Sequence, residues 1–252
     1  MRRTAWTSLV LGFGLLTVTA KPVKTAAAAK GDYVILLHGS GRTAWSMKRL
    51  ELRLKHSGYR VINESYPSWN TPVEKLAEDY LAKLLRERIT DPGTRVHFVT
   101  HSLGGILVRQ YLARHDLPQL GRVVMLGPPN GGSEVVDHLR TWGLTRTLLG
   151  TSRLPLGTGA ADLPRRLGPV QFECGIIAGD RSLNPLLSRW LPRPNDGKVS
   201  VASARVDGMR DFLVVHHTHT WMMQRESVIR QVLAFLQTGN FERPLASGRA
   251  VG

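Results

Sequence analysis

The sequence predicts an α/β protein with a mostly parallel central sheet and helices on both faces of that sheet. Short apolar runs rich in β-branched residues alternate with longer segments whose apolar residues recur at three- and four-residue spacing. The first of the short runs, Tyr33–Leu37, is continuously apolar, as expected of a strand buried on both faces. The 252 residues suffice for one large domain, and the 42% hydrophobic residues suffice for its core.

The strands and helices follow one another in an order typical of such a sheet. The expected strands, in chain order, cover residues 33–37, 59–63, 95–99, 121–126, 173–178 and 212–215. The helical patterns cover residues 72–85, 106–112 and 220–235. Pro72 suits the first turn of a helix, and Asp91-Pro-Gly93 ends the helical pattern that it opens. Strands that alternate with helices in this way indicate parallel pairing through crossovers.

The N-terminus has the layout of a secretory signal. Arg2 and Arg3 precede an uncharged stretch of 16 residues, 5–20. Residues 18–20, at the end of this stretch, and residues 26–29 are both compatible with a small-residue cleavage site. The stretch is shorter than the roughly 20 residues that span a bilayer, although an uncleaved inner-membrane anchor stays open. We therefore expect a signal peptide or anchor over residues 1–29 and export to the periplasm or medium. The domain should occupy 30–240, followed by a flexible tail over 241–252.

The chain is strongly basic, with a formal net charge of +15. Nucleic acid is an unsuitable partner, because no Lys/Arg block is interleaved with aromatic residues and an exported protein rarely meets it. An anionic membrane surface fits export better, and a merely solvated basic surface stays open as well. The single cysteine, Cys174, excludes an internal disulfide and is expected in a buried strand.

Residues 141–170 fit no regular element. Glycines and prolines interrupt the segment repeatedly, and leucines and arginines make up much of the remainder. A long irregular insertion in a compact domain is usually functional. The segment is expected to be a lid or cap over a binding site, or a simple cover of the core.

The segment Thr100-His-Ser-Leu-Gly-Gly105 stands between an expected strand and an expected helix. A serine on a sharp strand-to-helix turn with small neighbours is the arrangement that exposes a nucleophile. Ser102 is therefore the candidate nucleophile, and Gly105 would let the helix pack closely. Thr100 departs from the usual motif, which has glycine two positions before the serine.

A serine nucleophile needs a base, and the base needs an acid that orients it. Asp196, in a turn before a short apolar strand, is the preferred acid. Asp180 also follows a strand and is its rival, whereas Asp207 and Asp211 lie too close to the last strand. In an arrangement of this type the order along the chain is serine, acid, histidine.

Three histidines follow the last strand, at positions 216, 217 and 219. His216 and His217 extend the strand and should point to opposite faces. His219 lies on the loop itself and is the candidate base. A metal site is the alternative, but the cluster has no nearby cysteine or spaced acidic partner.

Two backbone N–H groups should stabilise the oxyanion. Leu103, directly after the nucleophile, would supply one, and Ser40, in the glycine-rich loop 38–42 after the first strand, would supply the other. A phosphate-binding loop is disfavoured, since the loop lacks the lysine and the glycine spacing of such motifs.

Five segments together resemble a known family. They are residues 38–47, 100–105, 126–134, 195–201 and 217–223. In this order they are similar to the bacterial lipases of the α/β-hydrolase superfamily, and among them to the GPI inositol-deacylase-like group, in which threonine leads the nucleophile motif. The resemblance implies an α/β-hydrolase fold, Ser102 as nucleophile, Asp196 as acid, His219 as base and no cofactor.

The expected function is an exported serine ester hydrolase, an esterase or lipase that forms an acyl-enzyme on Ser102 and takes an ester or lipid substrate. Two alternatives stay open at the level of the sequence. An acyltransferase would use the same triad with an acceptor hydroxyl in place of water. A non-catalytic protein that binds a membrane surface would retain the scaffold alone.

Overall fold

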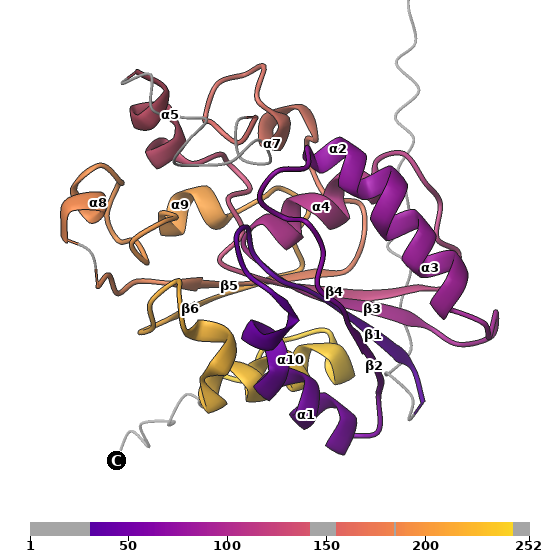
Figure 1. The fold of residues 1–252 in the computed structure, drawn as a ribbon. Helices are drawn as coiled ribbons and strands as arrows, with labels where there is room; N and C mark the ends of the chain where they lie inside the picture. The colour runs from indigo at the N-terminus through magenta and orange to yellow at the C-terminus, as the bar shows by residue number, and fades with distance from the viewer. Residues whose placement is uncertain (1–30, 142–154, 184, 244–252) are drawn as a thin grey trace, which may run out of the picture.

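A computed structural model describes residues 31–141, 155–183 and 185–243. The expected signal segment, the first part of the expected lid and most of the expected tail lie outside these residues. Six strands form one parallel sheet in the order β2-β1-β3-β4-β5-β6 (Figure 1). The strands are β1 (Tyr33–Leu37), β2 (Arg60–Asn63), β3 (Val96–His101), β4 (Leu120–Leu126), β5 (Cys174–Gly179) and β6 (Asp211–Val215). The predicted fold class is confirmed.

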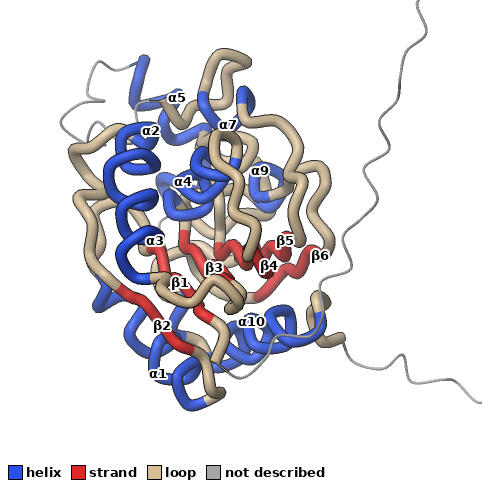
Figure 2. The backbone as a smooth tube through the Cα atoms, turned by 90° about the vertical axis from the view of Figure 1, so that its right-hand side faces the viewer, coloured by secondary structure: helices blue, strands red, loops and turns tan. Residues whose placement is uncertain are grey.

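Helices cover both faces of the sheet (Figure 2). One face carries α1 (Lys48–His56) and α10 (Glu226–Thr238). The other carries α4 (Leu103–Leu112) and a continuous helix made of α2 (Val73–Lys75), a π-helical stretch η2 (Leu76–Leu81) and α3 (Ala82–Arg88). Short elements complete the described chain: η1 (Ala44–Met47), α5 (Glu134–Thr141), α7 (Leu163–Arg166), α8 (Pro185–Arg189), α9 (Val201–Ala204) and η4 (Met222–Gln224).

Two apolar clusters hold the layers together, one on each face of the sheet. Every residue of β1 is buried, and its alternate side chains enter the two clusters. Cys174 is fully buried in β5, as expected of a small core residue. In the described part of the chain no helix is long and apolar enough to cross a membrane.

Elements and their boundaries differ from the predicted ones at several places. The sequence pattern did not predict α1, whose nine residues carry alternating charges around only three buried positions. The last helix begins at Glu226 and not at Thr220, because residues 218–224 form a turn and the short helix η4. Phe241, where the tail was expected to begin, is buried against Phe235, with 5.0 Å between the ring centroids.

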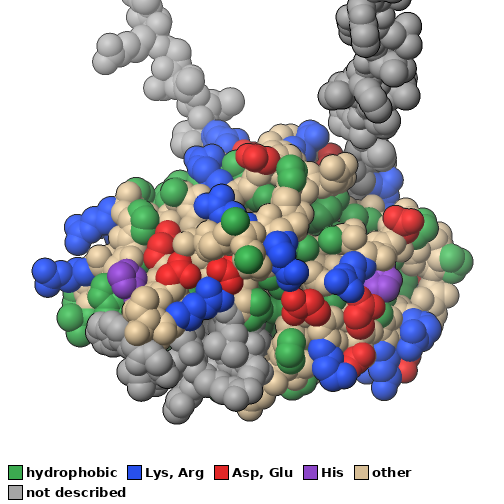
Figure 3. All heavy atoms as spheres, turned by 90° about the horizontal axis from the view of Figure 1, so that it is seen from above, with side chains coloured by type: hydrophobic (Ala, Val, Ile, Leu, Met, Phe, Trp, Pro, Cys, Tyr) green, Lys and Arg blue, Asp and Glu red, His purple; other side chains and the backbone are tan. Residues whose placement is uncertain are grey.

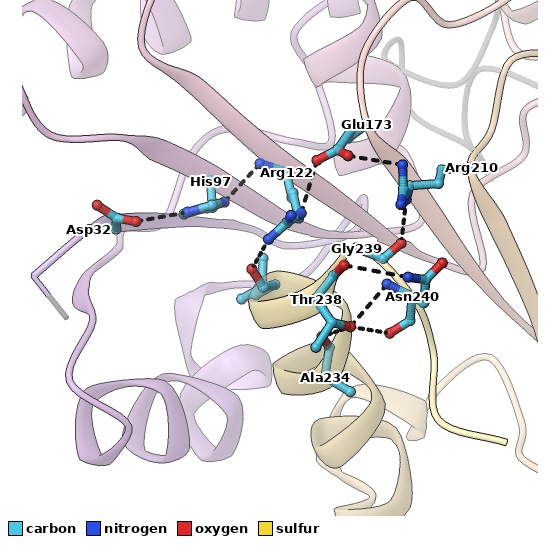
Figure 4. Close-up of polar contacts among 10 residues, drawn as sticks. Asp32, His97, Arg122, Glu173, Arg210, Ala234, Thr238, Gly239 and Asn240 are labelled. Atoms are coloured by element: carbon cyan, nitrogen blue, oxygen red, sulfur yellow. Dashed lines mark hydrogen bonds and ion pairs between the residues drawn. The ribbon is translucent and has the colours of Figure 1, made fainter. Parts of the chain in front are cut away.

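A polar network joins the amino ends of five strands, β1, β3, β4, β5 and β6 (Figure 4). His97 Nε2 lies 3.3 Å from Asp32 Oδ2, and the backbone N–H of Arg122 donates to His97 Nδ1 at 2.7 Å. The Arg122 side chain donates to Glu173 at 2.9 Å, and Arg210 pairs with the same carboxylate at 3.1 Å. Each charge of this network therefore has a partner of opposite sign or a hydrogen bond.

We expect the protein to lose stability as the pH falls from about 7 to about 5. Burial lowers the pKa of His97 below its ordinary value, although Asp32 opposes this shift. The unfolded chain takes up a proton near pH ~6.5 whereas folded His97 stays neutral to a lower pH, so acid favours the unfolded state. Urea unfolding at a series of pH values measures the effect, and His97→Gln should flatten the slope. Equal slopes in both proteins would contradict the assignment to His97.

Candidate active site

Ser102 occupies the turn between β3 and α4 in a strained conformation. Its φ of 53° and ψ of −117° make it the only non-glycine residue with positive φ in the described ranges. The turn requires small neighbours, because a Cβ on Gly104 would lie 2.4 Å from the Leu37 carbonyl oxygen. A Cβ on Gly105 would lie 3.0 Å from Pro128. Strain that the surroundings maintain is typical of functional positions.

Asp196 and His219 form a buried pair. His219 Nδ1 lies 2.7 Å from Asp196 Oδ2, and the backbone N–H of His219 donates to the Asp196 carbonyl oxygen at 3.1 Å. The second carboxylate oxygen accepts the backbone N–H groups of Lys198, at 3.0 Å, and Val199, at 2.8 Å. These bonds fix the carboxylate, which in turn orients the imidazole and leaves Nε2 for another partner.

Ser102 and His219 line one cavity of about 190 Å³. In the described residues no hydrogen bond joins the Ser102 hydroxyl to His219, although such bonds often tighten only when substrate is bound. The rest of the lining is mainly apolar: Leu103, Pro129, Ser133, Val135, Val136, Leu139, Leu156, Leu187, Lys198 and Val199. A mainly apolar cavity beside a serine and a histidine suits an apolar group with a reactive centre at its end.

The rival acid lies in a separate pair. Asp180 Oδ2 lies 2.7 Å from Nδ1 of His216, which is exposed to solvent. His217 Nε2 lies 2.8 Å from the Ser227 hydroxyl. The three histidines after β6 therefore contact three different partners, and only His219 lines the cavity that contains Ser102.

The loop after β1 lies against the nucleophile. A Cβ on Gly39 would lie 3.2 Å from the Ser102 Cβ and 2.8 Å from His101 Nδ1, so only glycine allows this approach. Ser40 follows in this loop and is buried. Leu103 opens α4, where the backbone N–H has no carbonyl partner within the helix. Both candidate N–H groups thus belong to segments that adjoin Ser102.

The segment after β2 holds this loop in place, which the sequence did not indicate. The Ser68 hydroxyl donates to the Gly39 carbonyl oxygen at 3.3 Å and accepts the Gly41 N–H at 3.1 Å. The Tyr66 hydroxyl donates to the His38 carbonyl oxygen, and the two rings stack with 4.1 Å between centroids. These contacts join residues that lie 27 to 29 positions apart, so no local motif reveals them.

His101 links the nucleophile turn to the base. Its Nε2 lies 2.9 Å from the His219 carbonyl oxygen, and the two rings are 4.8 Å apart. Burial, with the His219 ring as the second cause, holds the pKa of His101 well below its ordinary value. The neutral ring donates through Nε2 and so fixes the loop that carries the base.

The described part of the expected lid packs on the body. Leu156 lines the cavity, and the buried guanidinium of Arg109 donates to the carbonyl oxygens of Pro164, at 3.2 Å, and Gly168, at 2.7 Å. Burial lowers the pKa of Arg109 to about 10. Leu156 is therefore the residue of this segment that lines the cavity, and the Arg109 bonds hold the segment against α4.

The sequence and the fold of this chain are similar to those of known proteins. The model of the Alpha/beta hydrolase family matches residues 34–226. No curated protein matches the sequence. The structure is similar to Bacillus licheniformis lipase BlEst2 in its propeptide form, with a TM-score of 0.67, 18% identity, and coverage of 90% of this chain and 54% of that chain.

Two further solved structures share the fold. Phospholipase PlaB from Legionella pneumophila has a TM-score of 0.68 and 18% identity, with coverage of 84% of this chain and 60% of that chain. The metagenomic carboxyl esterase MGS0156 has a TM-score of 0.58 and 19% identity, with coverage of 80% and 68%. The chain thus spans about half the length of the BlEst2 propeptide form and three fifths of PlaB.

Proposed function

Because the chain belongs to the alpha/beta hydrolase family, we propose that it is an exported serine ester hydrolase that forms an acyl-enzyme on Ser102. One observation carries the proposal: a strained serine shares an apolar cavity with a histidine whose other ring nitrogen is hydrogen-bonded to a buried aspartate. The signal-like N-terminus supports export.

The first half of the reaction acylates the serine. His219 Nε2 takes the Ser102 proton as the hydroxyl oxygen attacks the ester carbonyl carbon. Asp196 stabilises the imidazolium that forms, and the backbone N–H groups of Ser40 and Leu103 receive the developing oxyanion. The tetrahedral intermediate then collapses, the carbon–oxygen bond of the ester breaks, and His219 returns its proton to the leaving alcohol.

The second half regenerates the enzyme. Water takes the place of the alcohol, His219 removes its proton, and the hydroxide attacks the acyl carbonyl. The carboxylic acid leaves as Ser102 regains its proton. The apolar wall of the cavity, which includes Val136, Leu139 and Leu156, would hold the acyl chain, and this supports an aliphatic ester or lipid as substrate.

Hydrolysis of p-nitrophenyl esters from short to long acyl chains tests the proposal. The expected result is turnover that a serine-directed phosphonate abolishes, with the phosphonyl adduct on the peptide that contains Ser102. The chain-length profile separates an esterase from a lipase. Turnover without an adduct on Ser102, or no turnover by folded protein on any ester, would overturn the proposal.

We expect Ser68→Ala to lower kcat about tenfold while KM stays nearly constant. The Ser68 hydroxyl bridges the Gly39 carbonyl and the Gly41 N–H on either side of Ser40, so its loss would loosen an oxyanion donor that acts mainly in the transition state. Steady-state kinetics on a soluble ester measure both constants.

Ser65→Ala is the matched control for this change. Ser65 lies three residues before Ser68 in the same segment. Its hydroxyl accepts the Ala44 N–H at 3.0 Å, outside the loop 38–42 that contains Ser40. The Ser65→Ala variant should keep kcat within about twofold of the parent protein. An equal loss in both variants would mean that the segment matters only for stability.

A further inference from the structure

The exposed large apolar side chains gather at the edge of the molecule that carries Ser102. Seven such side chains are exposed in the described ranges; Leu52 lies on α1 and Val214 is the penultimate residue of β6. The other five follow the carboxyl ends of strands: Trp45 after β1, Trp69 after β2, Leu183 and Leu186 after β5, and Trp221 after β6. All strand pairs are parallel, so these ends meet at one edge.

The helix α8 faces both the cavity and the solvent. Leu187 lines the cavity of Ser102, whereas the neighbouring Leu186 is 70% exposed and Leu183 is 73% exposed. Trp45, which follows β1, is 78% exposed. Leucine and tryptophan side chains exposed to this extent would gain free energy on entering an apolar phase beside the cavity.

The charges around α8 favour an anionic partner. Residues 181–195 contain three arginines and no aspartate or glutamate. Arg181 lies 3.7 Å from Asp180, but Arg189 and Arg193 form no ion pair with any described residue. By contrast, basic and acidic side chains are interspersed on the surface that carries α5 and α7 (Figure 3). Two of the pairs there are Arg140 with Asp162 at 2.6 Å and Arg166 with Glu74 at 3.4 Å.

We propose that this edge docks on the surface of an anionic phospholipid membrane. Leu183, Leu186 and Trp45 enter the boundary between headgroups and acyl chains, and Arg189 and Arg193 meet the lipid phosphates. Exposed leucines would enter the apolar layer of such a surface, and arginines that form no ion pair with a described residue would meet its phosphate layer. The inference rests on the proposed function in one respect: docking at this edge would bring acyl esters of the lipid to Ser102.

Site-specific fluorescent labels test the docking directly in the full chain. The environment-sensitive dye NBD is attached to Leu186→Cys and, as the matched control, to Leu52→Cys, which replaces an exposed leucine on α1. Cys174 is fully buried and so stays unlabelled. Vesicles of ether-linked phosphatidylcholine, with or without ether-linked phosphatidylglycerol, lack the acyl ester and are not consumed.

The expected result is a blue shift and a gain of NBD emission at position 186, only with phosphatidylglycerol, and no change at position 52. Arg193→Gln should reduce the ratio of docked to undocked label about fivefold. Because each label reports its own position, membrane binding by residues 1–30 does not mimic the result.

Equal responses at positions 186 and 52, or an equal shift on pure phosphatidylcholine, would overturn the inference. Hydrolysis of a soluble ester by the same labelled preparations separates it from the proposed function. Hydrolysis without a shift at position 186 would leave the hydrolase standing and remove the docking surface. A shift at position 186 without hydrolysis would support the docking surface and contradict the proposed hydrolase.

Discussion

Ser102→Ala is expected to lower kcat for ester hydrolysis by about 10⁴-fold or more. The substitution removes the only group that the proposed mechanism acylates, so the residual rate would come from binding and the oxyanion donors alone. The fold should persist, because the side chain of Ser102 makes no hydrogen bond with any described residue. Steady-state hydrolysis of a soluble p-nitrophenyl ester measures the loss, and circular dichroism checks the fold.

Two further variants sharpen this test. Ser133→Ala deletes a hydroxyl from the wall of the same cavity and should change kcat no more than about threefold. Ser102→Gly should be as inactive as the alanine variant but more stable by about 1 kcal/mol, because glycine adopts the positive φ of the turn without strain. Strong activity in either Ser102 variant would exclude this serine as the nucleophile.

Asp196→Asn is expected to lower kcat by about 10⁴-fold with little change in fold. An asparagine retains an acceptor for the N–H groups of Lys198 and Val199. Its amide, however, would donate to His219 Nδ1 and place the ring proton on Nε2, the atom that must accept the Ser102 proton. Single-turnover acylation by a p-nitrophenyl ester measures the step directly.

Asp180→Asn is the matched control for the acid. Asp180 forms the same type of pair with a histidine, but that histidine, His216, is exposed and does not line the cavity. The variant should keep kcat within about threefold of the parent protein. A large loss in Asp180→Asn with full activity in Asp196→Asn would reverse the assignment of the acid.

The strand β1 was predictable from sequence because it is a continuous apolar run buried by two layers. Tyr33–Leu37 has no polar residue, and the structure places every one of its side chains in the core. The helix α1 was missed for the opposite reason. Only Leu50, Glu51 and Leu54 are buried in it, so its apolar stripe is too narrow to stand out among its charges.

The candidate site was predictable where chemistry depends on short motifs. Ser102, Asp196 and His219 each lie in a turn with a local signature, and the structure brings Asp196 and His219 into hydrogen-bond contact. Tyr66 and Ser68 were missed because their bonds to the loop after β1 depend on how β2 lies beside that strand. Spatial neighbours of this kind leave no pattern in the chain.

The all-parallel sheet has a consequence for the way the chain folds. None of the six described strands pairs with its neighbour through a hairpin, and even their closest partners along the chain, Val96 and Leu120, are 24 positions apart. The register of β1 with β3 joins Tyr33 to Val96, with β2 and three helical segments in between. Each pairing must close a long loop before its contacts form, which slows folding. Until those loops close, newly made chains expose apolar strands that other copies can capture.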